Sequence, residues 1–277
     1  YIAEHPNMSK VPFFEADYPV VDIFHSPFYP LPIEIAAPAR ILTIYDLIPS
    51  LFPQFIPKES TQLQKLALHL LKPSDHLISI SSATNSDLCR LTKVETERTH
   101  VTHLAADSNI FFPCYDKEKL HEIRKKYEID KVPYILSLCT LEPRKNIDLV
   151  IRAYARLLRE GRIGETRLVL VGTKGWDFGK IFEEIQADPR LTSNIITTGY
   201  VPDEDLSPLY SGAAVFVYMS IYEGFGLPPL EAMQCGIPVI TSNTSSLPEV
   251  MGDAGIMLDP TDMDGLCMVL HQVLSDP

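Results

Sequence analysis

The sequence has little of what marks several common classes of protein. Its 277 residues include five cysteines, an odd number, and no Cys-x-x-Cys pair, so neither a disulfide framework nor a zinc site is indicated. It has no apolar run of about eighteen residues, so no membrane-spanning helix is predicted. It also has no basic tract, and its net charge of −12 makes nucleic acid an unfavourable partner. Unpaired cysteines favour a reducing, cytoplasmic compartment.

Apolar β-branched segments alternate with amphipathic segments along the chain. Because this alternation is typical of parallel sheets covered by helices, we predict an α/β fold with two Rossmann-like domains. The predicted domains are residues 1–115 and 133–277, joined by a densely charged linker over 116–132. The predicted strands are 20–24, 40–45, 76–80, 101–104, 134–138, 167–171, 194–197, 215–219 and 238–242, and the predicted helices are 60–71, 82–88, 117–127, 147–158, 203–210, 227–234 and 262–274.

A glycine-rich turn carries the strongest chemical signal. Glu223-Gly224-Phe225-Gly226 follows the strand 215–219, and Leu227 begins a helix. Glycines allow a ligand to approach the backbone closely, and the first N–H groups of a helix bind anions such as a diphosphate. Glu223 and Glu231 would instead accept hydrogen bonds from hydroxyls, those of a sugar and of a ribose respectively. An ordinary glycine turn flanked by two solvated glutamates remains the alternative.

Two further segments follow predicted strands. Thr140 to Asn146 follows the strand 134–138 and carries Arg144 and Lys145. Cations at the carboxyl end of a strand could neutralise phosphates and stabilise a leaving diphosphate. The alternative is an ordinary basic pair near a helix start, which the helix dipole disfavours. Gly199-Tyr200-Val201 follows the strand 194–197. This segment could contact a nucleotide base, and a plain loop is its alternative.

Together these segments resemble the GT-B glycosyltransferases, in particular the retaining family 4, also called glycosyl transferases group 1. Glu223 and Glu231, with the glycine turn between them, match the family's Glu-x7-Glu motif. The segment 141–146 matches its phosphate-binding loop, and the segment 199–206 matches its base-binding region. Many members have an arginine where this chain has Thr140, and Arg144 is expected to cover part of that role.

The resemblance also implies acceptor-side residues in the first domain. The segments 24–32 and 43–49 are similar to acceptor loops of members that add mannose or related hexoses. Tyr45 stands beside Asp46 where much of the family has a histidine, so His25 is the remaining histidine candidate near the reacting centre. A strand-end histidine bonded to a neighbour is the alternative for His25. The family's first strand and glycine-rich loop are not found before Val20, so the first domain is expected to be incomplete.

The resulting hypothesis is a retaining glycosyltransferase of mannosyltransferase-like type, active in polysaccharide biosynthesis without a metal or other cofactor. Its catalytic candidates are Glu223, Lys145, Arg144 and His25. Its partners would be a nucleotide sugar, with GDP-mannose favoured, and a glycan or lipid-linked acceptor, which leaves peripheral contact with the inner membrane face open. The alternatives are a non-catalytic nucleotide-sugar-binding fragment and a GT-B sugar-nucleotide epimerase. A nicotinamide enzyme is disfavoured because no Gly-x-Gly-x-x-Gly follows a strand.

Overall fold

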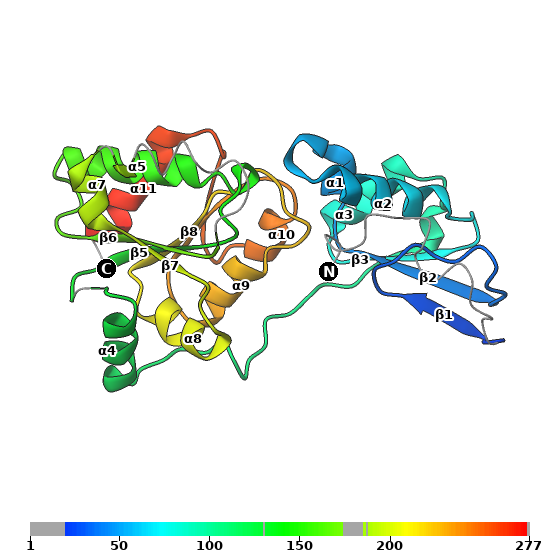
Figure 1. Cartoon of the computed structure of the whole chain (residues 1–277), viewed down its shortest axis with the longest axis horizontal. Helices are drawn as coiled ribbons and strands as arrows, with labels where there is room; N and C mark the ends of the chain where they lie inside the picture. The colour runs from blue at the N-terminus through cyan, green and yellow to red at the C-terminus, as the bar shows by residue number, and fades with distance from the viewer. Residues whose placement is uncertain (1–19, 130, 174–184, 187, 276–277) are drawn as a thin grey trace. The chain divides into compact units, whose positions relative to one another are not determined.

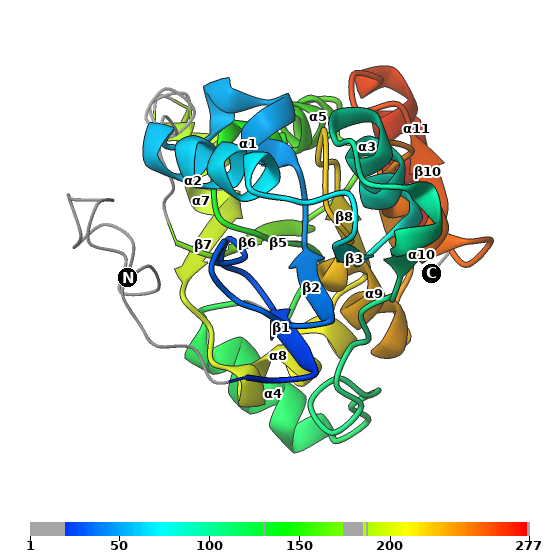
Figure 2. The ribbon, with the colours of Figure 1, turned by 90° about the vertical axis from the view of Figure 1, so that its right-hand side faces the viewer.

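The structure is a computed structural model that describes residues 20–129, 131–173, 185–186 and 188–275. The chain forms two compact units, Tyr1–His103 and Leu104–Pro277. Both contain parallel sheets with helices packed on them (Figure 1, Figure 2), so the predicted α/β class is confirmed. Among the described residues, no helix is long and apolar enough to cross a membrane.

The first unit is built on a parallel sheet with the strand order β1-β2-β3-β4. One face of this sheet is covered by the unit's α-helices (Figure 1). Leu42, Leu77 and Leu88 are fully buried between the two layers. The elements of this unit are β1 (Ile23–Ser26), β2 (Ala39–Ile44), α1 (Ile48–Leu51), η4 (Pro53–Phe55), α2 (Lys58–His69), β3 (His76–Ser79), α3 (Ser82–Leu91), η5 (Thr96–Arg98) and β4 (Thr99–Val101).

The second unit has a six-stranded parallel sheet with the order β10-β9-β8-β5-β6-β7. The chain runs from the central strand β5 through β6 to β7 at one edge, and then returns to the other side of β5 to form β8, β9 and β10. The strand order therefore reverses between β5 and β8, which makes this the topological switch point of the sheet. The strands are β5 (Tyr134–Leu138), β6 (Arg167–Val171), β7 (Ile195–Gly199), β8 (Val215–Tyr218), β9 (Val239–Ser242) and β10 (Ile256–Leu258).

Helices cover both faces of this second sheet. Figures 1 and 2 show α5 and α11 on one face and α8 and α9 on the other. In α5 the buried residues Val150, Ala153, Tyr154 and Leu157 recur every three or four positions, so one side of the helix packs on the sheet. The helices are α4 (Lys117–Lys126), η6 (Pro143–Lys145), α5 (Ile147–Arg159), α7 (Pro189–Asn194), α8 (Asp203–Ser211), α9 (Leu227–Gln234), α10 (Leu247–Met251) and α11 (Met263–Ser275).

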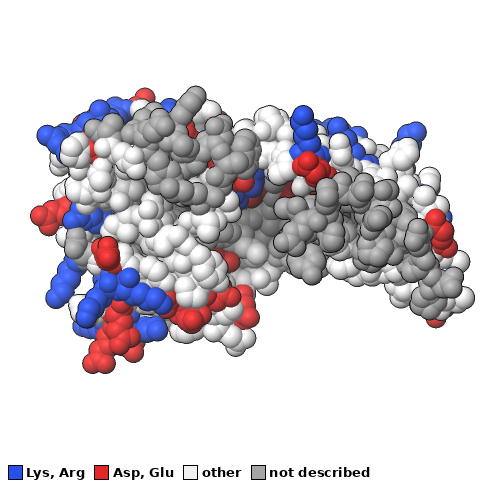
Figure 3. All heavy atoms as spheres, in the orientation of Figure 1, with Lys and Arg blue, Asp and Glu red and all other residues white. Residues whose placement is uncertain are grey.

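Helix α4 lies inside the segment that the sequence assigns to a linker. The buried carboxylate of Asp205 on α8 holds it, because the Tyr127 hydroxyl donates to Asp205 Oδ2 at 2.6 Å and Lys126 pairs with the same oxygen. Acidic and basic side chains are interleaved over α4 (Figure 3). The segment 116–132 therefore belongs to the second unit, which begins at Leu104, although the helix predicted within it is confirmed.

A close backbone approach joins the ends of β5 and β6. Gly172 has a φ of +134°, and a Cβ on it would lie 1.9 Å from the carbonyl oxygen of Cys139. We expect Gly172→Ala to destabilise the fold by about 3 kcal/mol or more, because backbone displacement adds to conformational strain. Gly161 is the matched control, since its φ is +68° but nothing lies within 4 Å of its Cβ position. Urea unfolding should show a loss of only about 1–2 kcal/mol for Gly161→Ala, and equal losses in both variants would contradict the steric explanation.

Candidate functional site

Two loops leave the carboxyl ends of β5 and β8, on either side of the switch point. Open α/β sheets bind their ligands in the crevice at this position. The backbone N–H of Ile221 in the second loop donates to the carbonyl of Arg144 in the first, at 2.9 Å. The Asn146 side-chain amide donates to the carbonyls of Met219, at 3.0 Å, and Pro260, at 2.7 Å. These bonds hold the two loops side by side and fix the side chains that they carry.

Four charged side chains meet between these loops, and we call them the four-charge cluster: Glu142, Arg144, Lys145 and Glu223. The Glu223 carboxylate lies 2.6 Å from Lys145 Nζ and 3.0 Å from Arg144 Nη1. The other amino nitrogen of Arg144 donates to Glu142 Oε1 at 2.6 Å. The Arg144, Lys145 and Glu223 side chains expose 9%, 13% and 10% of their surface. The structure thus brings together three of the four catalytic candidates that the sequence indicates.

Tyr218, the last residue of β8, completes this network. Its buried hydroxyl accepts a hydrogen bond from Lys145 Nζ at 2.8 Å and donates one to Glu223 Oε1 at 2.8 Å. Burial and the neighbouring Glu223 carboxylate raise the pKa of Tyr218 well above its usual value, so the hydroxyl keeps its proton. Sequence reasoning missed this residue. The available signal was a tyrosine at the carboxyl end of an otherwise apolar strand.

Glu223 is ionised despite its burial. Burial raises the pKa of this carboxyl, but the charges of Lys145 and Arg144 outweigh burial and hold the pKa at about 2. The backbone is also fixed, because the Ser245 hydroxyl accepts from the Glu223 N–H at 2.9 Å and the Ser246 hydroxyl donates to the Glu223 carbonyl at 3.0 Å. The site therefore presents a fixed carboxylate beside two cations.

Helix α9 begins directly after this carboxylate. Gly226 precedes its first turn with a φ of +123°, and a Cβ there would lie 2.7 Å from Leu247 Cδ2. Pro228 and Pro229 occupy the first turn, where a missing N–H removes no intrahelical bond. The positive end of the helix at Leu227 thus adds to the cations of the neighbouring loop. Phe225, by contrast, is buried, so its ring is part of the packing.

The second motif glutamate lies on α9 and is partly buried. The hydroxyl of Tyr210, a buried residue of α8, donates to Glu231 Oε2 at 2.9 Å. Burial raises the pKa of Glu231, and the Tyr210 hydrogen bond opposes this effect in part. One carboxylate oxygen is thereby held by the protein core, which orients the group. Tyr210 was another residue that sequence reasoning did not identify.

The remaining donor-side candidates lie at the ends of β5 and β7. Gly199 has a φ of +71°, and its carbonyl accepts from the N–H of Gly172 at 2.9 Å. Tyr200 exposes 74% of its surface, whereas Val201 is buried. Thr140 is exposed just after β5. The exposed Tyr200 side chain could contact a base. The predicted base-binding role of this segment stays a prediction.

The acceptor-side candidates belong to the first unit, at the carboxyl ends of β1 and β2. His25 Nε2 lies 2.8 Å from Thr43 Oγ1. Tyr45 is 41% exposed, and its ring centroid lies 6.5 Å from that of Phe28. Asp46 accepts from the N–H of Ile48 at 2.9 Å and so fixes the start of α1. Their proposed roles toward an acceptor stay predictions.

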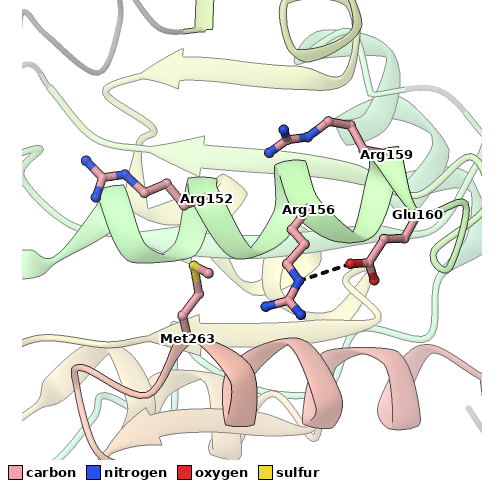
Figure 4. Close-up of a pocket in the computed structure, with 5 residues that line it drawn as sticks. All are labelled: Arg152, Arg156, Arg159, Glu160 and Met263. Carbon is pink, nitrogen blue, oxygen red and sulfur yellow. Dashed lines mark hydrogen bonds and ion pairs between the residues drawn. The ribbon is translucent and has the colours of Figure 1, made fainter.

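A pocket of about 550 Å³ lies elsewhere in the second unit, along α5 and α11 (Figure 4). Arg156 on α5 is already paired there with Glu160 and Asp264. None of the residues that line this pocket belongs to the four-charge cluster, and we assign the pocket no part in the candidate site. Among the residues that the structure describes, no group of three or more His, Cys, Asp or Glu side chains is arranged to hold a metal ion.

Known proteins with similar sequences include bacterial mannosyltransferases. The chain is 38% identical over 255 residues to O-antigen chain mannosyltransferase B of Escherichia coli. This alignment covers 92% of this chain and 65% of that protein. It is 29% identical over 180 residues to the GDP-mannose-dependent alpha-(1-6)-phosphatidylinositol monomannoside mannosyltransferase of Mycolicibacterium smegmatis, over 62% of this chain and 46% of that one. The chain thus spans less than two thirds of the length of either relative.

Solved structures share the fold. Sucrose-phosphate synthase from Thermosynechococcus elongatus matches with a TM-score of 0.73 and 22% identity, over 92% of this chain and 65% of that one. HepE from Anabaena, solved in complex with UDP-glucose, matches with a TM-score of 0.70 and 18% identity, over 86% and 63% of the two chains. Residues 119–277, more than half of the sequence, match the family described as glycosyl transferases group 1. The chain therefore belongs to the glycosyl transferases group 1 family.

Proposed function

We propose that this protein is a retaining glycosyltransferase that moves a hexose, with mannose favoured, from a nucleoside-diphosphate sugar to a glycan or lipid-linked acceptor in polysaccharide biosynthesis. The observation that carries the proposal is the contact between Lys145 and Glu223 at the switch point of the second sheet. A cation suited to a phosphate and a carboxylate suited to sugar hydroxyls stand side by side where α/β sheets bind ligands.

Each part of the site has a role in this proposal. Lys145 and the first-turn amides of α9 hold the diphosphate and stabilise the negative charge that develops on it as it leaves. Arg144 adds a second positive charge beside the same diphosphate. Glu223 binds hydroxyls of the transferred sugar, and Glu231, oriented by Tyr210, binds the ribose. Since protein cations and amides neutralise the diphosphate, the proposal requires no metal ion.

The donor is proposed to be GDP-mannose. The name of the M. smegmatis relative specifies GDP-mannose, and that of the E. coli relative specifies mannose transfer. UDP-sugars are the alternative, because HepE was solved with UDP-glucose. We place the reaction in the cytoplasm, and at the inner face of the membrane if the acceptor is lipid-linked.

Thermal unfolding with GDP-mannose, UDP-glucose and NAD tests this proposal. A ligand at about 100 times its Kd stabilises the folded state by about 2.7 kcal/mol, so GDP-mannose is expected to raise the Tm most. Transfer of radiolabelled mannose to an O-antigen-type acceptor should then proceed in the presence of EDTA. Binding without turnover would favour a binding protein, and an altered sugar on recovered nucleotide would favour an epimerase. Stabilisation by NAD alone would overturn the assignment.

A further inference from the structure

The four-charge cluster carries no net formal charge. Arg144 and Lys145 are matched by Glu142 and Glu223, at distances of 2.6 to 3.0 Å. Coulomb interactions are strong where water is excluded, so a diphosphate arriving beside Glu223 would meet an ionised carboxylate as well as two cations. In the arrangement that the structure shows, carboxylates already neutralise both cations, so these cations would contribute little to holding a diphosphate. For a cation to bind the diphosphate strongly, it has to exchange its carboxylate for phosphate.

Lys145 is the cation that can make this exchange. Its ammonium group has three N–H donors, and two of them go to Glu223 Oε1 and the Tyr218 hydroxyl. Arg144 is tied more firmly, because its guanidinium bonds the Tyr222 carbonyl at 2.6 Å as well as Glu142 and Glu223. A lysine on a flexible stem can redirect its donors at small cost, whereas the arginine holds its place.

We propose that Glu223 and the diphosphate compete for Lys145, an inference that rests on the proposed function. When the donor binds, Lys145 turns from Glu223 to the phosphates, and the sugar hydroxyls satisfy the released carboxylate. A free nucleoside diphosphate lacks the transferred sugar, and so the hydroxyls that would replace Lys145 at Glu223. Its binding therefore leaves this buried carboxylate with fewer partners, which is costly. After transfer, Lys145 returns to Glu223. The nucleoside diphosphate product then loses its contact with Lys145 and is bound less tightly. The same carboxylate thus binds the sugar and favours release of the nucleotide.

Glu142 offers a matched control for this competition. Like Glu223, it is a carboxylate bonded to Arg144. Only Glu223 is within bonding distance of Lys145, at 2.6 Å. Replacing either carboxylate by an amide removes the same charge from the same cluster. Only the replacement at position 223 frees Lys145 from an anionic partner.

The test is isothermal titration of the intact protein with GDP, and in parallel with UDP. Glu223→Gln is expected to bind the nucleoside diphosphate at least about tenfold more tightly than the unchanged protein. Glu142→Gln should change this affinity by less than about threefold. The affinity for GDP-mannose should not rise with that for GDP in Glu223→Gln, because the variant also loses its sugar contact. Glu223→Ala, which removes the same charge, serves as a second variant, and thermal unfolding verifies that each variant is folded.

Unchanged or weaker GDP binding by folded Glu223→Gln and Glu223→Ala would overturn the competition. Equal tightening in Glu142→Gln would overturn it too, since the effect would then be a general loss of negative charge and not an exchange at Lys145. These outcomes leave the proposed function standing, because the unchanged protein would still bind nucleotide. If the unchanged protein bound neither GDP, UDP nor their sugars, the proposed function would fail, and the competition with it.

Discussion

Lys145→Ala is expected to lower the rate of sugar transfer by about 10²–10³-fold, the usual loss when one preorganised charge stabiliser is removed. Lys145 is the cation of the cluster that can redirect its donors to the leaving diphosphate, and alanine cannot replace that charge. The fold should survive, because Glu223 keeps its contacts with Arg144 and the Tyr218 hydroxyl. The measurement is kcat with GDP-mannose, alongside the Tm of the variant.

Lys126→Ala is the matched control for this prediction. Lys126 also pairs with a buried carboxylate, that of Asp205, but it does so on α4. Its loss should lower the Tm while transfer stays within about twofold of the unchanged protein. If Lys145→Ala kept more than a tenth of the original kcat, the assignment of Lys145 to the diphosphate would be wrong. A fall in both variants would point to damage of the fold instead.

Much of the second unit could be predicted from sequence, because its strands are apolar runs bounded by turn residues. The predicted segments 134–138, 167–171 and 227–234 have the same bounds as β5, β6 and α9. Strand β10 was not predicted, since its run of three apolar residues at the sheet edge is too short to indicate a strand. The packing of α4 on the second unit could not be predicted either, because it depends on Asp205, which lies 79 residues from Lys126 in the sequence.

The site itself could be predicted only in part from the sequence. The rule that ligands bind at strand carboxyl ends indicated Lys145, Glu223 and Glu231. It could not indicate that Glu223 would pair with Lys145, because these residues lie 78 positions apart and their contact depends on how β5 and β8 pair. Tyr218 and Glu142 were missed for the same reason. In the segment assigned to base binding, Asp205 turned out to be buried against α4.

Arg144→Met separates stability from catalysis at the same site. We expect it to destabilise the fold by about 3–5 kcal/mol at neutral pH, the range for removing one partner of a buried ion pair. Arg144 is almost fully buried and is bonded to Glu142, Glu223 and the Tyr222 carbonyl. Without it, Glu142 would lose the cation with which it pairs, and the buried Glu223 carboxylate would keep only Lys145 as a cationic partner. Lost activity in Arg144→Met should therefore accompany a lowered Tm, unlike the loss in Lys145→Ala.

The pH dependence of this loss gives the sharper measurement. Glu223 has a pKa of about 2 in the folded protein and about 4.3 when unfolded, so its ion pairs stabilise the fold above pH 4.3 and lose their effect as pH falls toward 2. Without Arg144 the folded pKa of Glu223 rises, so the difference in unfolding free energy between variant and parent should be largest at pH 7 and shrink below about pH 4.3. Urea unfolding at pH 7 and pH 3 measures it. Arg90→Met, which removes an arginine paired at the surface with Asp87, should cost under about 1 kcal/mol. A small or pH-independent loss in Arg144→Met would mean that Arg144 does not hold the Glu223 charge.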